Sequence, residues 1–422
     1  MLKQLESKLL SHPELSALSA EEQFELIKTR AKHFVGETRL LKTLQTCKED
    51  NRQMRVKYGI DATGRDIHLG HAVPLFVLRR LQKMGHHIVL LIGDFTARVG
   101  DPTGRISTRP MLTVEQIREN ASRYTEQAGR ILDIAKTEVR FNNEWLEPFP
   151  LARFFQILSG LTVATAFQRD DFRKRESISR AEMLYSTLMA IDSVELNSEL
   201  ELGGDDQLLN FFDAEHVMEN EGMQPESAVT TDILFGTTGD GSKMSKSLGN
   251  FISVNADPEE KYGKLMSIPD NIIKQYFTLL TDISDEDWDI VETAMNNGTV
   301  HPMDVKRLLA RVVVTDLDGI EASIKAENSF DHSVVNKEAP EDIETKEITT
   351  KEAVSWVAIL RALNIPQADT NTSVRRLMEG NGVHRIDDSK DVTIHHDDAV
   401  PNVGETVLLR IGKRTYAQFV IK

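Results

Sequence analysis

Cysteine, net positive charge and long apolar runs are all scarce in this sequence. Cys47 is the single cysteine among 422 residues, so the chain has no internal disulfide and no thiolate pair for a metal. The formal net charge is −16. An acidic surface repels nucleic acid over most of its area, which argues against a general nucleic-acid coat protein. A local basic strip that grips one particular RNA stays possible.

The lack of long hydrophobic runs indicates where in the cell the protein is expected. No stretch approaches the ~18 consecutive apolar residues of a membrane span. The N-terminal segment "MLKQLESKLLSHPELSALSAEEQ" is polar and acidic, without the apolar centre of a signal or transit peptide. With 40% hydrophobic and 27% charged residues, the composition is that of a globular protein, and we expect a cytoplasmic one.

Strand and helix patterns alternate early in the chain. Arg55–Ile60 reads as a short strand, a helix is expected from about His68 to Met84, and "HIVLLIGDFTA" (87–97) has the continuous apolar run of a buried parallel strand. Strand, loop, helix and strand within about 40 residues make a βαβ unit. We therefore expect an α/β fold with a doubly wound parallel, Rossmann-like sheet.

The remaining patterns predict the domain order, in keeping with a length that suits two to four domains. We expect residues 1–232 to form the Rossmann-like domain with a helical insertion at about 114–185, and 233–326 to form a helical domain. Residues 327–349 are polar and charged, which is typical of a linker. Residues 350–422 combine helices with an alternating strand pattern and predict a small α+β domain.

Two histidines, His68 and His71, stand three residues apart at a predicted helix start. At this spacing they share a helix face, which suits a metal pair, capping residues or a nucleotide site. Helical zinc pairs usually have i, i+4 spacing, and a cysteine partner is missing here, which disfavours a metal. Helix N-termini attract phosphates, and Gly70 lets a flat adenine or ribose approach the backbone, which supports a nucleotide.

A second cluster, "GSKMSKSLGN" (241–250), places Lys243 and Lys246 three residues apart among glycines and serines. The ordinary interpretation is an exposed basic turn. The functional interpretation is a mobile lid whose ammonium groups neutralise charge as a phosphoanhydride breaks. The cluster lacks the spacing of a Walker P-loop, so that fold is not implied.

The two clusters together resemble the signature pair of class I aminoacyl-tRNA synthetases. Five segments look like consecutive signatures of the bacterial tyrosyl-tRNA synthetases: "VKYGIDATGRDIHLGH", "LLIGDFTARVGDPTGRISTRP", "EMLYSTLMAIDS", "ELGGDDQLLN" and "KMSKSLGN". The resemblance covers roughly residues 30–325, and the tail from "NTSVRRLMEGNGVHRI" to "LLRIGKRTYAQFVIK" is similar to the small RNA-binding domain that ends those enzymes.

This resemblance implies an enzyme, a tyrosine–tRNA ligase. Such enzymes join tyrosine to ATP, forming tyrosyl-adenylate and pyrophosphate, and then transfer the tyrosyl group to the 3′ end of tRNA-Tyr. The chemistry needs positioning and charge neutralisation more than an acid or a base. The implied substrates and partners are ATP with Mg²⁺, L-tyrosine, tRNA-Tyr and a second copy of the chain, with no membrane. The helical domain would lie on the anticodon side.

The resemblance also implies roles for individual residues on the ATP side. Thr63 and His68 would touch the γ-phosphate, and Gly70 and His71 would support the ribose or adenine. Lys243 and Lys246 would close on the departing pyrophosphate. Further implied contacts are Asp206 with the ribose hydroxyls, and Arg105 and Arg109 with pyrophosphate or tRNA. No metal ligand from the protein is implied.

On the amino-acid side, the implied contacts are Tyr58, Asp61, Thr96, Asp101, Tyr185, Met189, Asp192 and Gln207. Gln207 would hold the carboxylate, Asp101 and Tyr185 would lie near the ammonium group, and Asp192 would accept the phenol hydroxyl. Without this context, Asp192 would read as a helix-surface carboxylate and Tyr185 as a core aromatic. Either Lys57 or Tyr58 would face the phenol end, and the sequence does not decide between them.

One departure from the family pattern stands at Met189, where the family usually has a glutamine that reaches the substrate ammonium. A thioether accepts only weak hydrogen bonds. Ile191 also replaces a common aromatic residue, which would change the pocket wall. These changes keep open a synthetase paralogue that activates a tyrosine analogue. A degenerate synthetase-like RNA-binding protein is a second alternative, although the intact histidine and lysine pairs speak against it.

Overall fold

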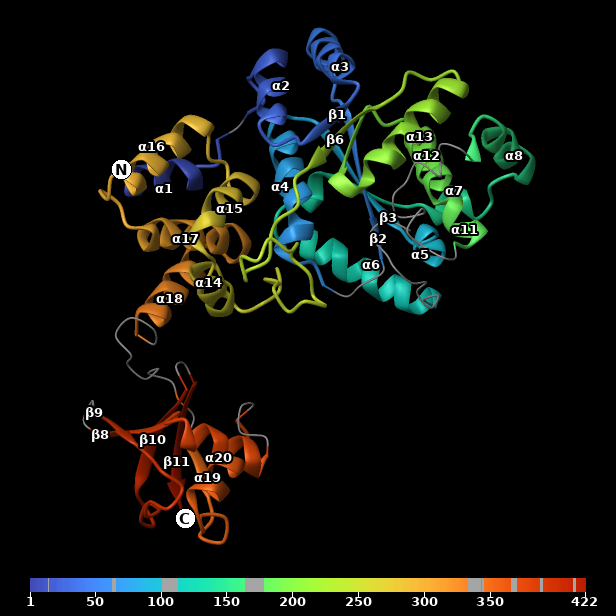
Figure 1. The fold of residues 1–422 in the computed structure, drawn as a ribbon. Helices are drawn as coiled ribbons and strands as arrows, with labels where there is room; N and C mark the ends of the chain where they lie inside the picture. The colour runs from blue at the N-terminus through green and yellow to red at the C-terminus, as the bar shows by residue number, and fades with distance from the viewer. Residues whose placement is uncertain are drawn as a thin grey trace. The chain divides into compact units, whose positions relative to one another are not determined.

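The computed structural model describes residues 1–13, 15–62, 66–100, 113–163, 178–332, 343, 345–365, 370–387, 390–412 and 415–422. They fall into two units, Met1–Ser323 and Ile324–Lys422 (Figure 1). In the part of the chain that is described, no helix is both long and apolar enough to cross a membrane.

The first unit is built on a six-stranded sheet of order β1-β6-β5-β2-β3-β4. The strands are β1 (His33–Val35), β2 (Arg55–Asp61), β3 (His87–Gly93), β4 (Thr137–Phe141), β5 (Leu200–Gly204) and β6 (Ser227–Thr231). Only β1 is antiparallel to its neighbour. The chain winds outward from β2 in both directions, so the predicted doubly wound class is confirmed. Ligands bind such sheets at the carboxyl ends of the strands where the winding reverses, here β2 and β5.

Helices pack on both faces of this sheet, and some further helices of the first unit lie away from it. They are α1 (Leu2–Leu10), α2 (Ala20–Lys28), α3 (Glu37–Glu49), α4 (Leu69–Lys83), α5 (Thr96–Val99), α6 (Val114–Ala128), η1 (Ile134–Lys136), α7 (Asn143–Leu146), α8 (Leu151–Ser159), α11 (Arg180–Met183), α12 (Tyr185–Leu196), η2 (Asp205–Gln207) and α13 (Leu208–Asn220). In Figure 1, α4 lies on one side of the sheet, and α12 and α13 lie on the other.

A helical segment follows the sheet within the same unit. It contains α14 (Pro258–Met266), η3 (Asp270–Ile272), α15 (Ile273–Leu280), α16 (Asp285–Asn296) and α17 (Pro302–Asp318), while α18 (Ile320–Phe330) crosses the boundary between the units. Helix α4 lies between this segment and the sheet (Figure 1). That position explains why α4 is apolar along most of its length, since residues on all its sides are buried.

The second unit carries a five-stranded sheet of order β7-β11-β10-β8-β9. Its elements are β7 (Thr345–Ile348), α19 (Trp356–Ala362), α20 (Asn371–Glu379), β8 (Val383–Asp387), β9 (Lys390–Thr393), β10 (Thr406–Ile411) and β11 (Thr415–Ile421). The alternating tail forms the antiparallel pair β10–β11, as predicted. Trp356 packs edge-on against Phe419, with ring centroids 6.2 Å apart, in the core of this unit.

Two segments differ from their expected structure. The predicted helical insertion at about 114–185 contains β4, whose residues are all half-buried because this strand forms the edge of the sheet. The predicted linker at 327–349 is occupied at one end by α18 and at the other by β7, which pairs in parallel with β11. Both strands are short and partly exposed, so they lack a strong apolar pattern.

Buried ion pairs fasten α4 to the helical segment. Arg79 Nη2 lies 2.8 Å from Asp316 Oδ2, and Arg80 pairs with Asp282. His12 Nε2 lies 2.7 Å from the other oxygen of Asp316, whose side chain is only 1% exposed. Hydrogen bonds to Asp282 and Asp316 raise the pKa of His12. Because α4 begins beside His68, these pairs set the position of the histidine pair relative to the helical segment.

We expect Asp316→Asn to lower the free energy of unfolding by about 3–5 kcal/mol, because it leaves Arg79 buried without its counter-charge. The raised pKa of His12 means that its contribution is full below the ordinary imidazole value and fades as the pH rises through the raised value. The loss should therefore be larger at about pH 6 than at about pH 9. Urea unfolding at both pH values tests this, with the exposed Asp289→Asn as control. Equal, small losses for both variants would contradict it.

Candidate active site

A cleft of about 680 Å³ opens at the carboxyl ends of β2 and β5. All predicted site residues that the structure describes line it: Tyr58, Asp61, His68, Gly70, His71, Thr96, Tyr185, Met189, Asp192, Asp206, Gln207, Lys243 and Lys246. The remaining predicted residues, Thr63, Asp101, Arg105 and Arg109, lie outside the described residues. Segments far apart in the chain thus meet at one place, as the resemblance implies.

The histidine pair caps α4 and also faces the cleft. His68 is the N-cap residue, and its Nδ1 accepts a long hydrogen bond of 3.4 Å from the His71 N–H. The two rings stack with centroids 3.7 Å apart. A Cβ at Gly70 would lie 3.1 Å from the His68 ring, so the bare glycine backbone allows this close packing. The capping and site interpretations therefore both describe the same two rings.

Both imidazoles are uncharged at neutral pH. Burial lowers the pKa of His68, which is 5% exposed, to about 3. The protein atoms that surround His71 lower its pKa to about 4, although this residue is open to solvent in the cleft. The charge of Lys246 lowers both values further. At neutral pH the rings can donate or accept hydrogen bonds, but they cannot act as cations. Among the described residues, no group of three or more acidic, histidine or cysteine side chains is placed to hold a metal ion.

The lysine loop closes over the start of α4. Lys246 Nζ donates to the Asp66 carbonyl at 2.6 Å, and the Gly70 N–H lies 3.4 Å from the sulfur of Met244. Just beyond the loop, the Leu69 N–H donates to the Ile252 carbonyl at 2.9 Å. The loop itself is held as a tight turn by Asn250, which bonds both of its sides. These contacts favour the lid interpretation over an unattached basic turn.

Asp61, the last residue of β2, gathers hydrogen bonds at the opposite end of the cleft. Thr96 Oγ1 donates to one oxygen at 2.6 Å, and the Tyr185 hydroxyl donates to the other at 3.1 Å. A Cβ at Gly93 would lie within 2.3 Å of both acceptor and donor atoms, Asp61 Oδ1 and Thr96 Oγ1. Only glycine leaves room for this pairing, which holds the Asp61 carboxylate at a defined point.

Asp192 is a buried acceptor on α12. Trp145 Nε1 donates to its Oδ1 at 2.8 Å, and Asn142 Nδ2 donates to its Oδ2 at 3.1 Å. Burial raises the pKa of Asp192 to about 7, against the opposing charge of Lys57. Asn142 and Trp145 are site residues that the sequence alone did not predict. They follow directly after β4, and a correct prediction of that strand would have placed them at the carboxyl end of the sheet.

Helix α12 turns one face to the cleft and another to the core. Tyr185, Met189 and Asp192 line the cleft, at the i, i+4 and i+7 spacing of one helix face. Met189 also packs against an apolar cluster that contains Phe211. Ile191 is fully buried in the core and does not line the cleft. The expectation that Ile191 changes the pocket wall is therefore wrong.

The structure shows which of Lys57 and Tyr58 lies near Asp192, a question that the sequence leaves open. Lys57 Nζ donates to the hydroxyl of Ser193, the residue after Asp192, at 2.5 Å. Tyr58 lies instead among Tyr124 and Asp206, and burial together with these groups raises its pKa well above the usual value for tyrosine. Lys57 is thus at the Asp192 end of the cleft, and Tyr58 is on the side of Asp206.

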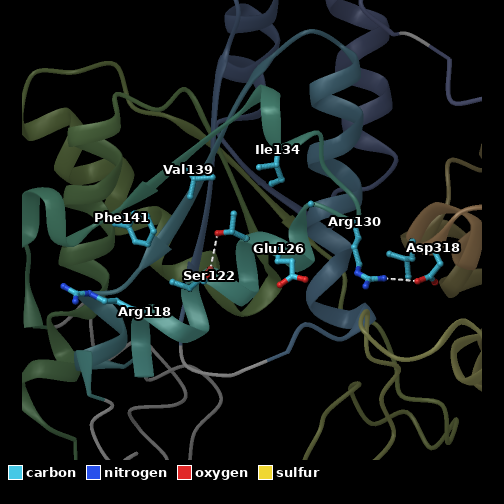
Figure 2. Close-up of a pocket in the computed structure, with 12 residues that line it drawn as sticks. Arg118, Ser122, Glu126, Arg130, Ile134, Val139, Phe141 and Asp318 are labelled. Atoms are coloured by element: carbon cyan, nitrogen blue, oxygen red, sulfur yellow. Dashed lines mark hydrogen bonds and ion pairs between the residues drawn. The ribbon is translucent and has the colours of Figure 1, made fainter. Parts of the chain in front are cut away.

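A second hollow, of about 1020 Å³, lies between α6, β4 and the end of α17 (Figure 2). Apolar side chains such as Val139 and Phe141 form much of its wall. Arg130 Nη1 pairs with Asp318 Oδ1 at 2.9 Å across one side, and the buried Lys261 pairs with the same carboxylate at 2.6 Å. These pairs brace α6, α14 and α17. None of the predicted site residues that are described lines this hollow, so the chemistry is assigned to the first cleft.

Comparison with known proteins identifies the family of this chain. The model of a family described as tRNA synthetases class I (W and Y) matches residues 48–334. The chain belongs to this family. The histidine pair and the lysine loop of this family member both line the first cleft.

Relatives of this class I synthetase match over nearly its whole length. The tyrosine–tRNA ligase of Thermotoga maritima is 42% identical over 407 residues, which cover 94% of this chain and 97% of the relative. The tyrosine–tRNA ligase of Symbiobacterium thermophilum is 37% identical over 97% of this chain and 100% of its own. A tyrosyl-tRNA synthetase from Archaeoglobus fulgidus, solved with L-tyrosine, shares the fold with a TM-score of 0.61 at 24% identity, over 73% of this chain and 99% of that one.

We expect Gly93→Ala to lower the free energy of unfolding by about 1–3 kcal/mol, because the added methyl group overlaps the Asp61–Thr96 pair. Gly263→Ala is the matched control. Gly263 lies within α14 with open space around it, so alanine there should stabilise the protein by up to about 1 kcal/mol. Denaturant unfolding of both variants checks the opposite signs. A Gly93→Ala variant as stable as the native chain would show that the pair is not tightly held.

Proposed function

We propose that this chain is a tyrosine–tRNA ligase, which activates tyrosine with ATP and transfers the tyrosyl group to the 3′ end of tRNA-Tyr. One arrangement carries the proposal: the lysine loop closes over the His68–His71 pair at one end of the cleft, while a buried carboxylate, Asp192, stands at the other. Relatives with this name match nearly the whole chain.

In the activation step, a carboxylate oxygen of tyrosine attacks the α-phosphate of ATP. The bond from that phosphorus to the bridging oxygen breaks, and the electron pair leaves with pyrophosphate. Lys243 and Lys246 neutralise the charge that develops there, and the neutral rings of His68 and His71 donate hydrogen bonds. The step needs no proton transfer, which suits two histidines that stay uncharged at neutral pH.

The opposite end of the cleft selects the amino acid. Asp192 accepts the phenol hydroxyl, while Asp61, Thr96 and Tyr185 form the polar wall nearest the ammonium group. Phenylalanine would leave the buried Asp192 oxygen without its partner, which is a strong ground for rejection. Met189 gives the same wall an apolar patch, which keeps a tyrosine analogue as the alternative substrate.

Asp206 and Gln207 stand between the two ends, directly after β5. We assign Asp206 to the ribose and Gln207 to the amino-acid carboxylate. Mg²⁺ would enter with ATP, held by the phosphates themselves, as is common for this ion. We also propose the cytoplasm as the compartment, residues 233–326 as the anticodon-side domain and residues 350–422 as the RNA-binding domain.

Amino-acid-dependent exchange between ATP and pyrophosphate tests this function. We expect exchange with tyrosine, followed by charging of tRNA-Tyr. Lys246→Ala should reduce the exchange rate constant by about 10²–10³-fold, because it removes one charge that stabilises the transition state. Lys274→Ala, an exposed lysine on α15, is the control.

The other possible results of this assay each support a different function for the chain. Exchange with a tyrosine analogue but not with tyrosine would identify a paralogue with another amino-acid substrate. No exchange with any amino acid would leave a synthetase-like RNA-binding protein. A Lys246→Ala variant with native exchange would remove the lysine loop from the mechanism.

We propose that the chain acts as a homodimer. Helix α8 presents Leu151 and Phe155 to solvent with exposed fractions of 68% and 61%, and Val163 follows at 62%. Exposed apolar side chains gathered in one segment are typical of an interface. The double variant Leu151→Asp, Phe155→Asp should halve the mass measured by light scattering. Val354→Asp, equally exposed but in the second unit, should leave it unchanged. A native chain that is already monomeric would contradict the proposal.

A further inference from the structure

A buried cluster of charges lies beside the Asp192 end of the cleft. Lys57 Nζ is 2.9 Å from Glu201 Oε2 and 3.7 Å from Glu226 Oε1, and it donates to Ser193 Oγ at 2.5 Å. The side chain of Lys57 is 0% exposed, and the two carboxylates are 3% and 2% exposed. Nothing in the mechanism above uses this cluster, although taking such charges out of water is expensive.

The cluster joins four elements at one point. Lys57 comes from β2, Glu201 from β5, Glu226 from the residue before β6, and Ser193 from α12. Ser198 donates a hydrogen bond to Glu226, which holds that carboxylate from the other side. The ammonium group has little freedom to move, because its neighbours are anchored on strands and on a buried helix.

The cluster holds one ammonium group between two carboxylates. Burial raises the pKa of Glu201 well above its usual value, and the charge of Glu226 acts in the same direction, whereas the charge of Lys57 opposes both. Lys57 stays charged, since the pKa of its ammonium group is raised by Glu201, Glu226 and Asp192 in spite of burial. Lys57 also lines the cleft itself, so its charge acts on a further carboxylate there.

That carboxylate is Asp192. It is next to Ser193 in the chain, and Lys57 is the strongest of the groups that oppose the effect of burial on its pKa. Asn142 and Trp145 also favour its ionised form, whereas the charge of Asp94 acts against it. An ionised carboxylate accepts shorter and stronger hydrogen bonds than a neutral acid does. The state of Asp192 therefore decides how well this end of the cleft recognises a hydroxyl group.

We propose that Lys57 is a positioning residue for amino-acid selection: locked by Glu201, Glu226 and Ser193, its ammonium group favours the ionised form of Asp192 and so sets the preference for a phenol over a bare phenyl ring. The inference rests on the proposed tyrosine–tRNA ligase function. Lys57 acts through Asp192 and does not take part in the transfer of the adenylyl group. Glu201 and Glu226 serve to hold the ammonium group in place.

The test is Lys57→Met, which keeps much of the side-chain length and removes the charge. Exchange between ATP and pyrophosphate is measured with tyrosine and with phenylalanine from about pH 6 to about pH 9. Without Lys57, Asp192 should titrate at higher pH, so the acid limb of kcat/KM for tyrosine should move upward by about one pH unit or more. At about pH 7 the ratio of tyrosine to phenylalanine should fall about tenfold and recover near pH 9.

A second readout needs no substrate. Because Trp145 Nε1 donates to Asp192, Trp145 fluorescence should follow the titration of that carboxylate. The midpoint should shift upward in Lys57→Met, and the signal should be missing in Trp145→Phe. Lys57→Arg keeps the charge and should restore both the midpoint and the amino-acid ratio. If Lys57→Met folds poorly, both measurements are made on the double variant Lys57→Met, Glu226→Gln instead. This double variant removes one buried charge of each sign.

Lys261→Met is the matched control. Lys261 is another fully buried lysine paired with a carboxylate, but it lies beside the second hollow, away from Asp192. It should lose stability without changing the pH profile or the amino-acid ratio. Equal losses for tyrosine and phenylalanine in Lys57→Met, with an unmoved acid limb, would overturn the inference and leave Lys57 a structural residue. A native chain that exchanges with neither amino acid would instead overturn the proposed function, and the inference with it.

Discussion

The cleft depends on a short backbone pairing between two segments that are distant in the chain. The Leu69 N–H bonds the Ile252 carbonyl, and the Val254 N–H bonds the Ile67 carbonyl, each at 2.9 Å. Backbone hydrogen bonds of this kind are insensitive to side-chain identity, but they fix register. Here they bring the lysine loop onto the N-terminus of α4, and Lys246 can reach the loop that precedes His68 only because this register holds.

Helix α4 transmits that arrangement to the rest of the first unit. Its N-terminus carries the stacked imidazoles, and its last turns carry the arginines that pair with Asp282 and Asp316. A buried helix with fixed contacts at both ends moves as a rigid element, because close packing leaves its side chains little free volume. The helical segment and the nucleotide end of the cleft are therefore mechanically linked through one element.

Positive charge has a different role at each end of the cleft. At the nucleotide end, the exposed Lys243 and Lys246 lie beside imidazoles whose lowered pKa values keep them neutral, so the lysines supply the positive charge that meets a phosphate group. At the amino-acid end, buried carboxylates would all tend toward their neutral forms, and a single buried ammonium group offsets this tendency. Positive charge is used for substrate neutralisation at one end and for holding an acceptor at the other.

The sequence by itself determined the first βαβ unit, the doubly wound class of the sheet and the placement of both signature clusters at one site. Long apolar runs and ordered motifs can be recognised in a sequence before any tertiary contact is known. The short strand β4 was not predicted, because it forms an edge of the sheet. Its residues are all half-buried, so its sequence shows no clear alternation of apolar and polar residues. Only the tertiary structure decided that Asn142 and Trp145 hold Asp192, that Ile191 faces the core, and that Lys57 rather than Tyr58 stands at the Asp192 end. These outcomes depend on which side of a helix or strand meets which neighbour, and such pairings arise only when distant segments pack together.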